Sequence, residues 1–315
     1  MYRFVNNEDE GRFHVKKYDD LVFDYSARLA YSKNILENLR SIISAKIDFN
    51  QYSFNTIKSW ISYDLGWQQY INKKTIIMLS YSYLPDFYIA HYRDDDWTKI
   101  YGYTSETFQR YSFSKTDYSL WVQHSFSDET KARIYFSHTK YFYNEHFTEY
   151  DSDNFMFGGR VFHDLSNKIT IDAGYKYTSS NAKGFDEPFE TKQNSDDNDA
   201  TYYEHVFSAG IEYKMPKIFR LNNTISISAE FILRDYTTEH SVESDPLHAE
   251  RNDFNYRLYL DYNIDILNNF SAGVFLNLLF RDADTSIEMN REYVSDEKDY
   301  NQFQLGLDFN YKFQF

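Results

Sequence analysis

The end of the chain alternates strictly between apolar and polar side chains. Odd positions from Phe303 to Phe315 are large and apolar, whereas even positions are polar or glycine. The apolar set is Phe303, Leu305, Leu307, Phe309, Tyr311, Phe313 and Phe315. Successive side chains of a β-strand point to opposite faces. The segment therefore predicts a strand with one apolar face and one polar face.

The same period of two recurs along the chain, which predicts an all-β fold. Tyr259 is the one residue that breaks the pattern in its segment, and the register of 154–164 stays open. The alternation is strong in the segments 20–31, 39–50, 168–178, 223–233, 252–266 and 303–315. It is weaker in the segments 56–71, 75–93, 109–127, 131–143, 154–164, 202–214 and 270–282.

Hydropathy and composition place these strands in a membrane. Aromatic residues make up 20% of the chain although its mean hydropathy is −0.68, which fits a surface that is apolar on one face only. No apolar run reaches the roughly 18 residues of a membrane helix. Strands satisfy their backbone groups in lipid only in a closed barrel. We therefore expect a transmembrane antiparallel up-and-down β-barrel.

Short and long connections alternate between the predicted strands, and only the link near 51–56 is shorter than this rule predicts. Bacterial barrels have short periplasmic turns and long outer loops, so we place the short links on the periplasmic side. The short links are 33–37, 72–74, 127–130, 165–167, 215–219 and 267–269. The long links are 6–19, 93–108, 144–153, 179–201, 236–252 and 283–299.

The strand count predicts a barrel of about 14 strands, with 16 as the alternative. Thirteen segments are visible, bacterial single-chain barrels have even numbers, and Tyr2 and Phe4 look like the end of one more strand. Residues 1–5 are too few to span a core of about 30 Å. We therefore expect residues 1–315 to form one barrel domain that lacks upstream sequence, namely a signal peptide and the start of the first strand. We also expect strand 300–315 to be incompletely paired within this chain.

The C-terminal residues carry a family resemblance. Phe313 and Phe315, preceded by Gly306 and Tyr311, resemble the C-terminal β-signal of Gram-negative outer-membrane β-barrels, a porin-like superfamily. The resemblance implies an integral protein of the cell outer membrane, in contact with outer-membrane lipids. It also implies that Gly306, Tyr311, Phe313 and Phe315 are read by the barrel-assembly machinery. No subfamily is identified by these residues.

Enzymatic activity is not expected. The barrel enzymes of this superfamily need His residues combined with Ser or Asp at fixed strand positions, and no such motif is recognisable. His124 and His138 share the parity of the apolar face. One interpretation is a catalytic or proton-linked histidine. The alternative, which we favour, is a histidine at the membrane interface without a partner to make it a base.

The polar face is the candidate functional surface. Its charges predict a water-filled lumen, and the alternative is that they pair across strands and plug it. The predicted pore-lining residues are Asp24, Arg28, Arg40, Lys46, Asp48, Asp64, Arg133, Arg160, Asp172, Lys176, Glu212, Arg234, Arg257, Asp261 and Asp308. We expect a channel for passive or weakly selective passage of small hydrophilic solutes. The alternatives are the C-terminal barrel of a protein that exports polysaccharide or assembles surface lipoproteins, and a structural or adhesive barrel.

Acidic residues are concentrated in the long links, for example at Asp196, Asp197, Asp199 and Asp245. They are interpreted as solvated loop charges that give a modest cation preference, with a Ca²⁺ site as the alternative. No metal and no cofactor are expected. The net charge of −15 argues against nucleic-acid binding. The absence of cysteine excludes disulfides, thiolate metal sites and a cysteine nucleophile.

Overall fold

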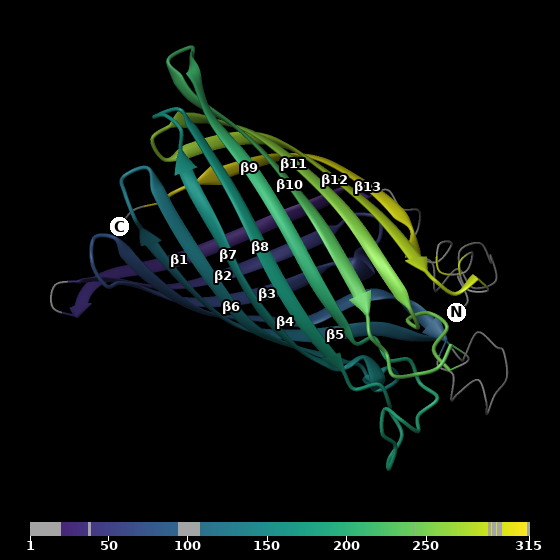
Figure 1. The fold of residues 1–315 in the computed structure, drawn as a ribbon. Helices are drawn as coiled ribbons and strands as arrows, with labels where there is room; N and C mark the ends of the chain where they lie inside the picture. The colour runs from purple at the N-terminus through teal and green to yellow at the C-terminus, as the bar shows by residue number, and fades with distance from the viewer. Residues whose placement is uncertain are drawn as a thin grey trace.

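A computed structural model describes residues 20–36, 39–93, 108–242, 244–288, 291, 294 and 298–313. These residues form one antiparallel sheet of 13 strands, in which each strand pairs with its neighbours in sequence. The sheet curls into a barrel-shaped wall (Figure 1). The strands are β1 (Val22–Leu36), β2 (Leu39–Tyr52), β3 (Trp60–Tyr70), β4 (Thr75–Arg93), β5 (Phe108–Ser125), β6 (Thr130–Tyr143), β7 (Ser152–Asp164), β8 (Ile169–Ala182), β9 (Tyr202–Ile218), β10 (Leu221–Tyr236), β11 (Arg251–Leu267), β12 (Phe270–Thr285) and β13 (Tyr300–Tyr311).

Each of the thirteen predicted segments contains one strand, so the all-β up-and-down architecture is confirmed. Most boundaries differ by a few residues; the last strand, predicted at 303–315, spans Tyr300–Tyr311, and two further differences change the predicted links. The predicted strand 56–71 begins only at Trp60, because a 3-10 helix, η2 (Thr56–Lys58), precedes it. The first strand continues to Leu36, through most of the predicted link 33–37. The fourteenth strand, assigned to residues 1–5, lies outside the described residues.

The two terminal strands of the sheet run in the same direction, because an up-and-down order with an odd number of strands places them so. β13 pairs with β12 from Tyr300 to Tyr311. Within the described ranges, neither β1 nor β13 has a second hydrogen-bonded neighbour. A direct pair between these two strands would be parallel, unlike every other pair in the sheet.

Three short turns are stabilised by the same kind of side-chain to backbone hydrogen bond. The Asn72 side-chain oxygen accepts hydrogen bonds from the backbone N–H groups two and three residues later, at 2.8 Å each. The Ser127 and Ser166 hydroxyls accept the equivalent pairs, at 3.1–3.2 Å. Such side-chain acceptors stabilise tight reversals. These residue types therefore explain why the predicted short links are turns.

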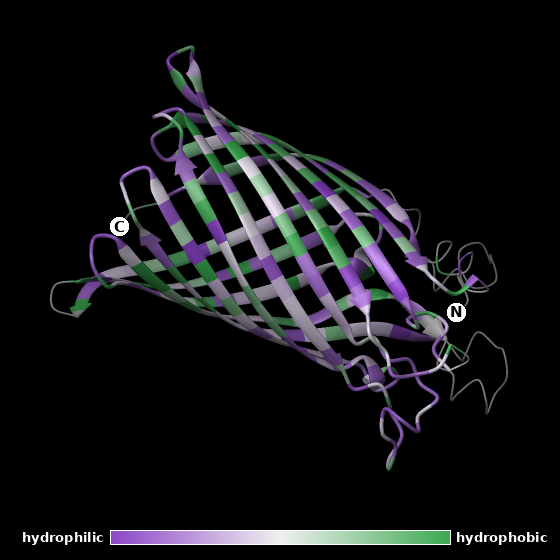
Figure 2. Cartoon of the chain, in the orientation of Figure 1, coloured by the Kyte–Doolittle hydropathy of each residue, from purple (hydrophilic) through white to green (hydrophobic). Residues whose placement is uncertain are grey.

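The apolar face of the sheet points outward. Leu305 and Phe309 on β13 are 67% and 69% exposed, as expected for side chains that contact lipid rather than a protein core. Apolar and polar residues alternate along the strands (Figure 2). Among the described residues, no helix is long and apolar enough to cross a membrane.

Buried side chains gather instead at the end of the sheet where the long links lie, here called the outer end. Asp199 and Asp245 in two long links are 0% exposed, and Arg251, which begins β11, is 2% exposed. Val294 of another long link is 1% exposed. The packed core of this molecule therefore lies between its outer connections and the outer ends of the strands.

Candidate functional site

The strand register places the polar side chains on one face. Residues paired across neighbouring strands share a face of the sheet. One continuous row of such pairs crosses from β5 to β13. The row consists of Gln123, Arg133, Arg160, Gly174, Ser208, Glu230, Arg257, Leu279 and Gln302. Charged residues of distant strands thus belong to a single surface.

This polar face is the concave one. A cavity of about 350 Å³ is lined by side chains from nine consecutive strands, from Ile89 on β4 to Arg281 on β12. Side chains of so many strands meet at one cavity only if they point to the inside of a curled sheet. The lining residues have the parity of the charged row. The polar face therefore lines the lumen.

All fifteen residues predicted to line the pore lie on this face in the register of their strands. Several form ion pairs across or along strands. Arg160 lies 2.5 Å from Asp172, and Lys46 lies 2.8 Å from Asp48. Others form no ion pair with any residue that the structure describes, namely Asp64, Lys176, Glu212, Asp261 and Asp308. The structure thus places these residues together on one wall, and their role in solute passage stays a prediction.

Charges in the middle of the lumen remain accessible to water. The Arg257 guanidinium lies 3.1 Å from the Glu230 carboxylate, and their side chains are 44% and 28% exposed. A second cavity of about 300 Å³ adjoins this pair. Tyr259, the exception to the alternation, also lines this cavity, and its ring lies 6.2 Å from the Phe275 ring. This part of the wall is wet and mixed in charge.

The outer end of the lumen is different. The cavity of about 350 Å³ there is walled by tyrosine rings and arginines, and we name it the tyrosine chamber. Its tyrosines are Tyr111, Tyr141, Tyr143, Tyr150, Tyr202 and Tyr236, and its arginines are Arg234, Arg251 and Arg281. Arg234 stacks over the Tyr202 ring at 4.0 Å, and Arg251 stacks over the Tyr236 ring at 4.6 Å.

Two carboxylates hold the three arginines of the chamber. Glu204 accepts from Arg234 at 2.6 Å. Asp253 accepts from Arg251 at 2.7 and 2.8 Å and from Arg281 at 2.5 Å. The Arg251–Asp253 pair is desolvated, since its side chains are 2% and 1% exposed, whereas the other members of the network, Arg281, Arg234 and Glu204, keep 18–28% of their side-chain surface exposed. Charged hydrogen bonds of this kind are strong where water is excluded.

Long links close over the chamber. The backbone N–H of Asp199, in the link between β8 and β9, donates to Asp245 in the link between β10 and β11, at 2.8 Å. Asp245 also accepts from the His248 ring at 2.8 Å, and that ring lies 5.0 Å from the Tyr236 ring. The interpretation of the link acids as solvated charges is wrong for Asp199 and Asp245. Both are buried because they join two links.

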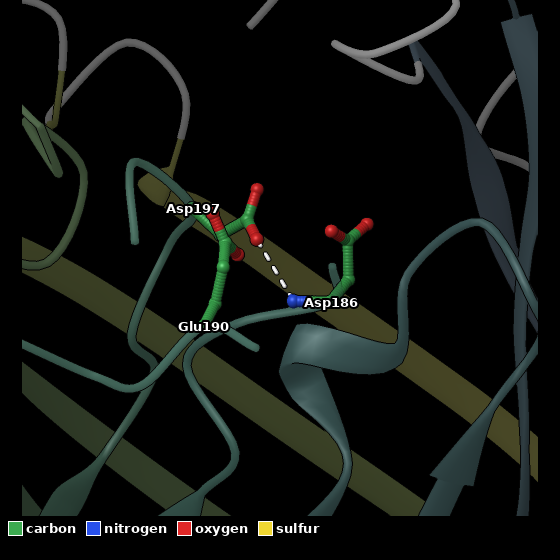
Figure 3. A group of neighbouring side chains, drawn as sticks. All are labelled: Asp186, Glu190 and Asp197. Carbon is green, nitrogen blue, oxygen red and sulfur yellow. Dashed lines mark hydrogen bonds between the residues drawn. The ribbon is translucent and has the colours of Figure 1, made fainter. Parts of the chain in front are cut away.

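One group of acids in the β8–β9 link resembles a metal-binding set. Carboxylate oxygens of Asp186, Glu190 and Asp197 lie within 4.8 Å of one another (Figure 3). Groups of the same link hold them, since Asp197 accepts from the Asp186 backbone at 2.9 Å and the Ser195 hydroxyl lies 3.2 Å from Glu190. Neighbouring carboxylates of this kind are common in loops without an ion, and the absence of a metal stays a prediction.

The two histidines of the apolar face both have polar partners. His124 lies 3.0 Å from the Thr75 hydroxyl, and His138 lies 2.8 Å from the Asp153 carboxylate. The His138 ring also stacks on Phe155 at 4.4 Å. The expectation that no partner could make these histidines bases is wrong for His138, because strand pairing brings the Asp153 carboxylate beside it, whereas His124 has only a hydroxyl partner there. The absence of enzymatic activity stays a prediction.

Among the residues of the predicted assembly signal, Gly306 has a packing role that the motif did not suggest. The Phe275 ring lies against Gly306 so closely that a Cβ there has no room. Tyr311 and Phe313 are exposed side chains, whose rings lie 4.4 Å apart. Phe315 lies outside the described residues.

The tyrosine chamber was not predicted from the sequence, although the weak alternation of three segments was a signal for it. Alternation is weak in 109–127, 131–143 and 202–214, which form β5, β6 and β9. Inward rings such as Tyr111, Tyr141 and Tyr202 cause this weakness, because they place aromatic residues on the polar face. A blurred alternation in strands that are otherwise well formed therefore marks the chamber.

Among known proteins, the chain matches solved structures but no protein-family model and no curated protein. The chain is similar to a bacterial polysaccharide outer membrane secretin, at 10% identity and a TM-score of 0.46 over 92% of this chain and 80% of the other. It is similar to the outer membrane channel DcaP of Acinetobacter baumannii, at 11% identity and a TM-score of 0.48 over 91% and 84%. It is also similar to the CymD monoaromatic hydrocarbon channel, at 8% identity and a TM-score of 0.44 over 94% and 88%.

The geometry of the chain itself assigns its class. Consecutive antiparallel strands form one curled sheet, whose outward face is apolar and whose inward face carries the charges. Such a surface is stable in lipid and not in water. Short turns at one end and long links at the other complete the pattern. The chain therefore has the fold of a transmembrane up-and-down β-barrel, with a lipid-facing outer surface and a polar lumen.

Proposed function

We propose that this barrel is an outer-membrane channel for passive or weakly selective passage of small hydrophilic solutes. The observation that supports the proposal is the wet, charged middle of the lumen. Arg257 and Glu230 keep 44% and 28% of their side-chain surface exposed although they point to the inside of the sheet. A lumen plugged by its own side chains would bury such a pair.

Both charge signs line this route, so steep selectivity is not expected. Arg160 pairs with Asp172 and Arg257 pairs with Glu230, which leaves the wall mixed rather than uniform in sign. Mixed charges tolerate polar solutes and bias ions only moderately. The polar wall thus favours small hydrophilic solutes over apolar ones.

Insertion of the barrel is proposed to depend on the barrel-assembly machinery. Tyr311, the last residue of β13, and Phe313, just after it, present exposed rings, as the resemblance to the C-terminal β-signal implies. The outward face, for example Leu305 and Leu307, supplies the surface for outer-membrane lipids. No catalytic role is proposed for the His138–Asp153 pair.

Conduction through a planar bilayer tests the channel. The refolded full chain should give stepwise conductance in KCl, and Arg257→Gln should shift the reversal potential in a KCl gradient toward cation preference. Lys140→Gln is the matched control. Lys140 has the parity of the outward face and pairs there with Asp153 at 3.2 Å, so its loss should leave the reversal potential unchanged. A folded protein that never conducts would contradict the proposal.

A further inference from the structure

The tyrosine chamber has the dimensions of a small-molecule site. Its volume is about 350 Å³, and small-molecule pockets span about 300–1,000 Å³. Aromatic rings surround it, and some pack on one another. The Tyr111 and Tyr143 rings stack at 5.1 Å, and the Tyr150 ring meets Tyr111 edge-on at 5.5 Å. Such walls offer a flat ligand both ring faces and ring edges.

The chamber has more guanidinium groups than carboxylates. Glu204 pairs with Arg234, whereas Asp253 alone serves both Arg251 and Arg281. The Nε–H of Arg281 is buried without a hydrogen-bond partner in the structure. Because one carboxylate serves two guanidinium groups, a planar oxyanion beside the more exposed Arg281 would supply the missing negative charge.

Two buried acids of the long links are already paired with other cations. Asp245 already accepts from the His248 ring, and Asp199 lies 3.3 Å from the Lys192 ammonium. Both carboxylates are fully buried among the links. Neither of these two carboxylates pairs with an arginine of the chamber, although the chain as a whole has a net charge of −15.

We propose that the tyrosine chamber binds a small organic carboxylate whose body is a flat ring. The carboxylate would lie at Arg281, and the ring would pack among the tyrosines. This assignment rests on the proposed channel function, since it names the solute class that the outer end of the lumen recognises. Apolar rings without a charge leave the Arg281 surplus uncompensated, and small inorganic anions leave the tyrosine faces uncovered.

Binding to the refolded full chain in detergent tests the proposal with benzoate as the probe. Calorimetric titration should give measurable affinity for benzoate and at least about tenfold weaker binding of benzyl alcohol, which lacks the charge. Inorganic phosphate, which lacks the ring, should also bind at least about tenfold more weakly. Equal binding of benzoate and either comparison compound would overturn the proposal, as would the absence of benzoate binding.

Arg281→Gln removes the surplus charge while Asp253 keeps both bonds to Arg251. It should weaken benzoate binding by about tenfold, because a charged hydrogen-bond partner is lost. Arg220→Gln is the matched control, since it makes the same substitution at an exposed position in the β9–β10 turn. Its benzoate affinity should equal that of the wild type. Equal affinity of the Arg281→Gln protein and the wild type would overturn the assignment.

The binding and conduction experiments fail independently. The titration needs no ion flow, and the bilayer recording needs no benzoate. A protein that conducts but does not prefer benzoate overturns the chamber assignment alone. A protein that binds benzoate at Arg281 but never conducts overturns the channel proposal and leaves a ligand-binding barrel. If Arg281→Gln fails to fold, the relative affinities of the wild type for benzoate, benzyl alcohol and phosphate still test the chamber assignment.

Discussion

Charged side chains are exposed in the middle of the lumen and buried at its outer end. Arg257 and Glu230 in the middle are 44% and 28% exposed. Arg251 and Asp253, which share strand β11 and its inward face with Arg257, are 2% and 1% exposed. Glu230 lies on the inward face of the neighbouring strand β10, so the face of the wall does not explain the difference. The long links cause it, because they fold over the outer end and exclude water there.

The long links that cover one end of the barrel wall therefore determine how strongly the charges there interact. Exposed ion pairs contribute little to stability, whereas a buried network depends on every partner. The same residue types therefore suit a water-filled passage in one place and a selective chamber in another. Substitutions at the two places should separate these roles.

Loss of a carboxylate is the strongest test of this difference. Asp253→Asn leaves the Arg251 and Arg281 guanidinium groups without their anion, and should lower the free energy of unfolding by about 3–5 kcal/mol. Asp172→Asn removes the partner of the wetter Arg160 and should cost about 1 kcal/mol or less. Urea unfolding of the refolded proteins in detergent measures both. Equal losses would mean that the outer end is as wet as the middle.

Packing inside the lumen can be tested at Gly306. Gly306→Ala forces the Phe275 ring off its position and should cost about 1 kcal/mol in the same unfolding assay. Gly159→Ala is the control, because a Cβ there meets nothing closer than 3.6 Å. The added substitution Phe275→Leu should restore the stability of the Gly306→Ala protein. If it does not, the ring is not the cause.

The smallest expected effect concerns pH at the outer links. Burial opposes ionisation of Asp20, but hydrogen bonds from the backbone of Phe54, Asn55 and Ser53 and from the Asn55 amide outweigh it and lower its pKa below 3.8. A lowered pKa stabilises the fold above the unfolded value. That contribution is lost as the pH falls through the folded value.

Asp151 behaves in the opposite sense. Burial raises its pKa above 3.8 despite a hydrogen bond from the Tyr143 backbone, so its ionisation costs stability as the pH rises through the folded value. Unfolding midpoints of Asp20→Asn and Asp151→Asn, followed from pH 3 to pH 6, should therefore diverge from the wild type in opposite directions. Parallel curves for the two variants would contradict these pKa shifts.

Much of the fold followed from alternation alone. The segment 303–315 and its weaker relatives located every strand, because a strand that faces lipid on one side and water on the other must alternate. The chamber did not follow, since no local pattern states which long links fold inward. The sequence predicts that Asp245 is a solvated acid. Its structural role is evident only from its tertiary contact with the Asp199 backbone.

The capped turns at Asn72, Ser127 and Ser166 have a consequence for how the molecule forms. Each joins two strands that are neighbours in sequence, and every pairing in the sheet is of this kind. The loops that these three turns close are short, and hairpins of this type form in about 1–10 μs. The wall can grow by adding one hairpin after another, without waiting for distant segments to meet. Contacts between separate links, such as that from Asp199 to Asp245, span 46 residues. They belong to the last and slowest stage, so the chamber should acquire its final shape only after the wall that carries it.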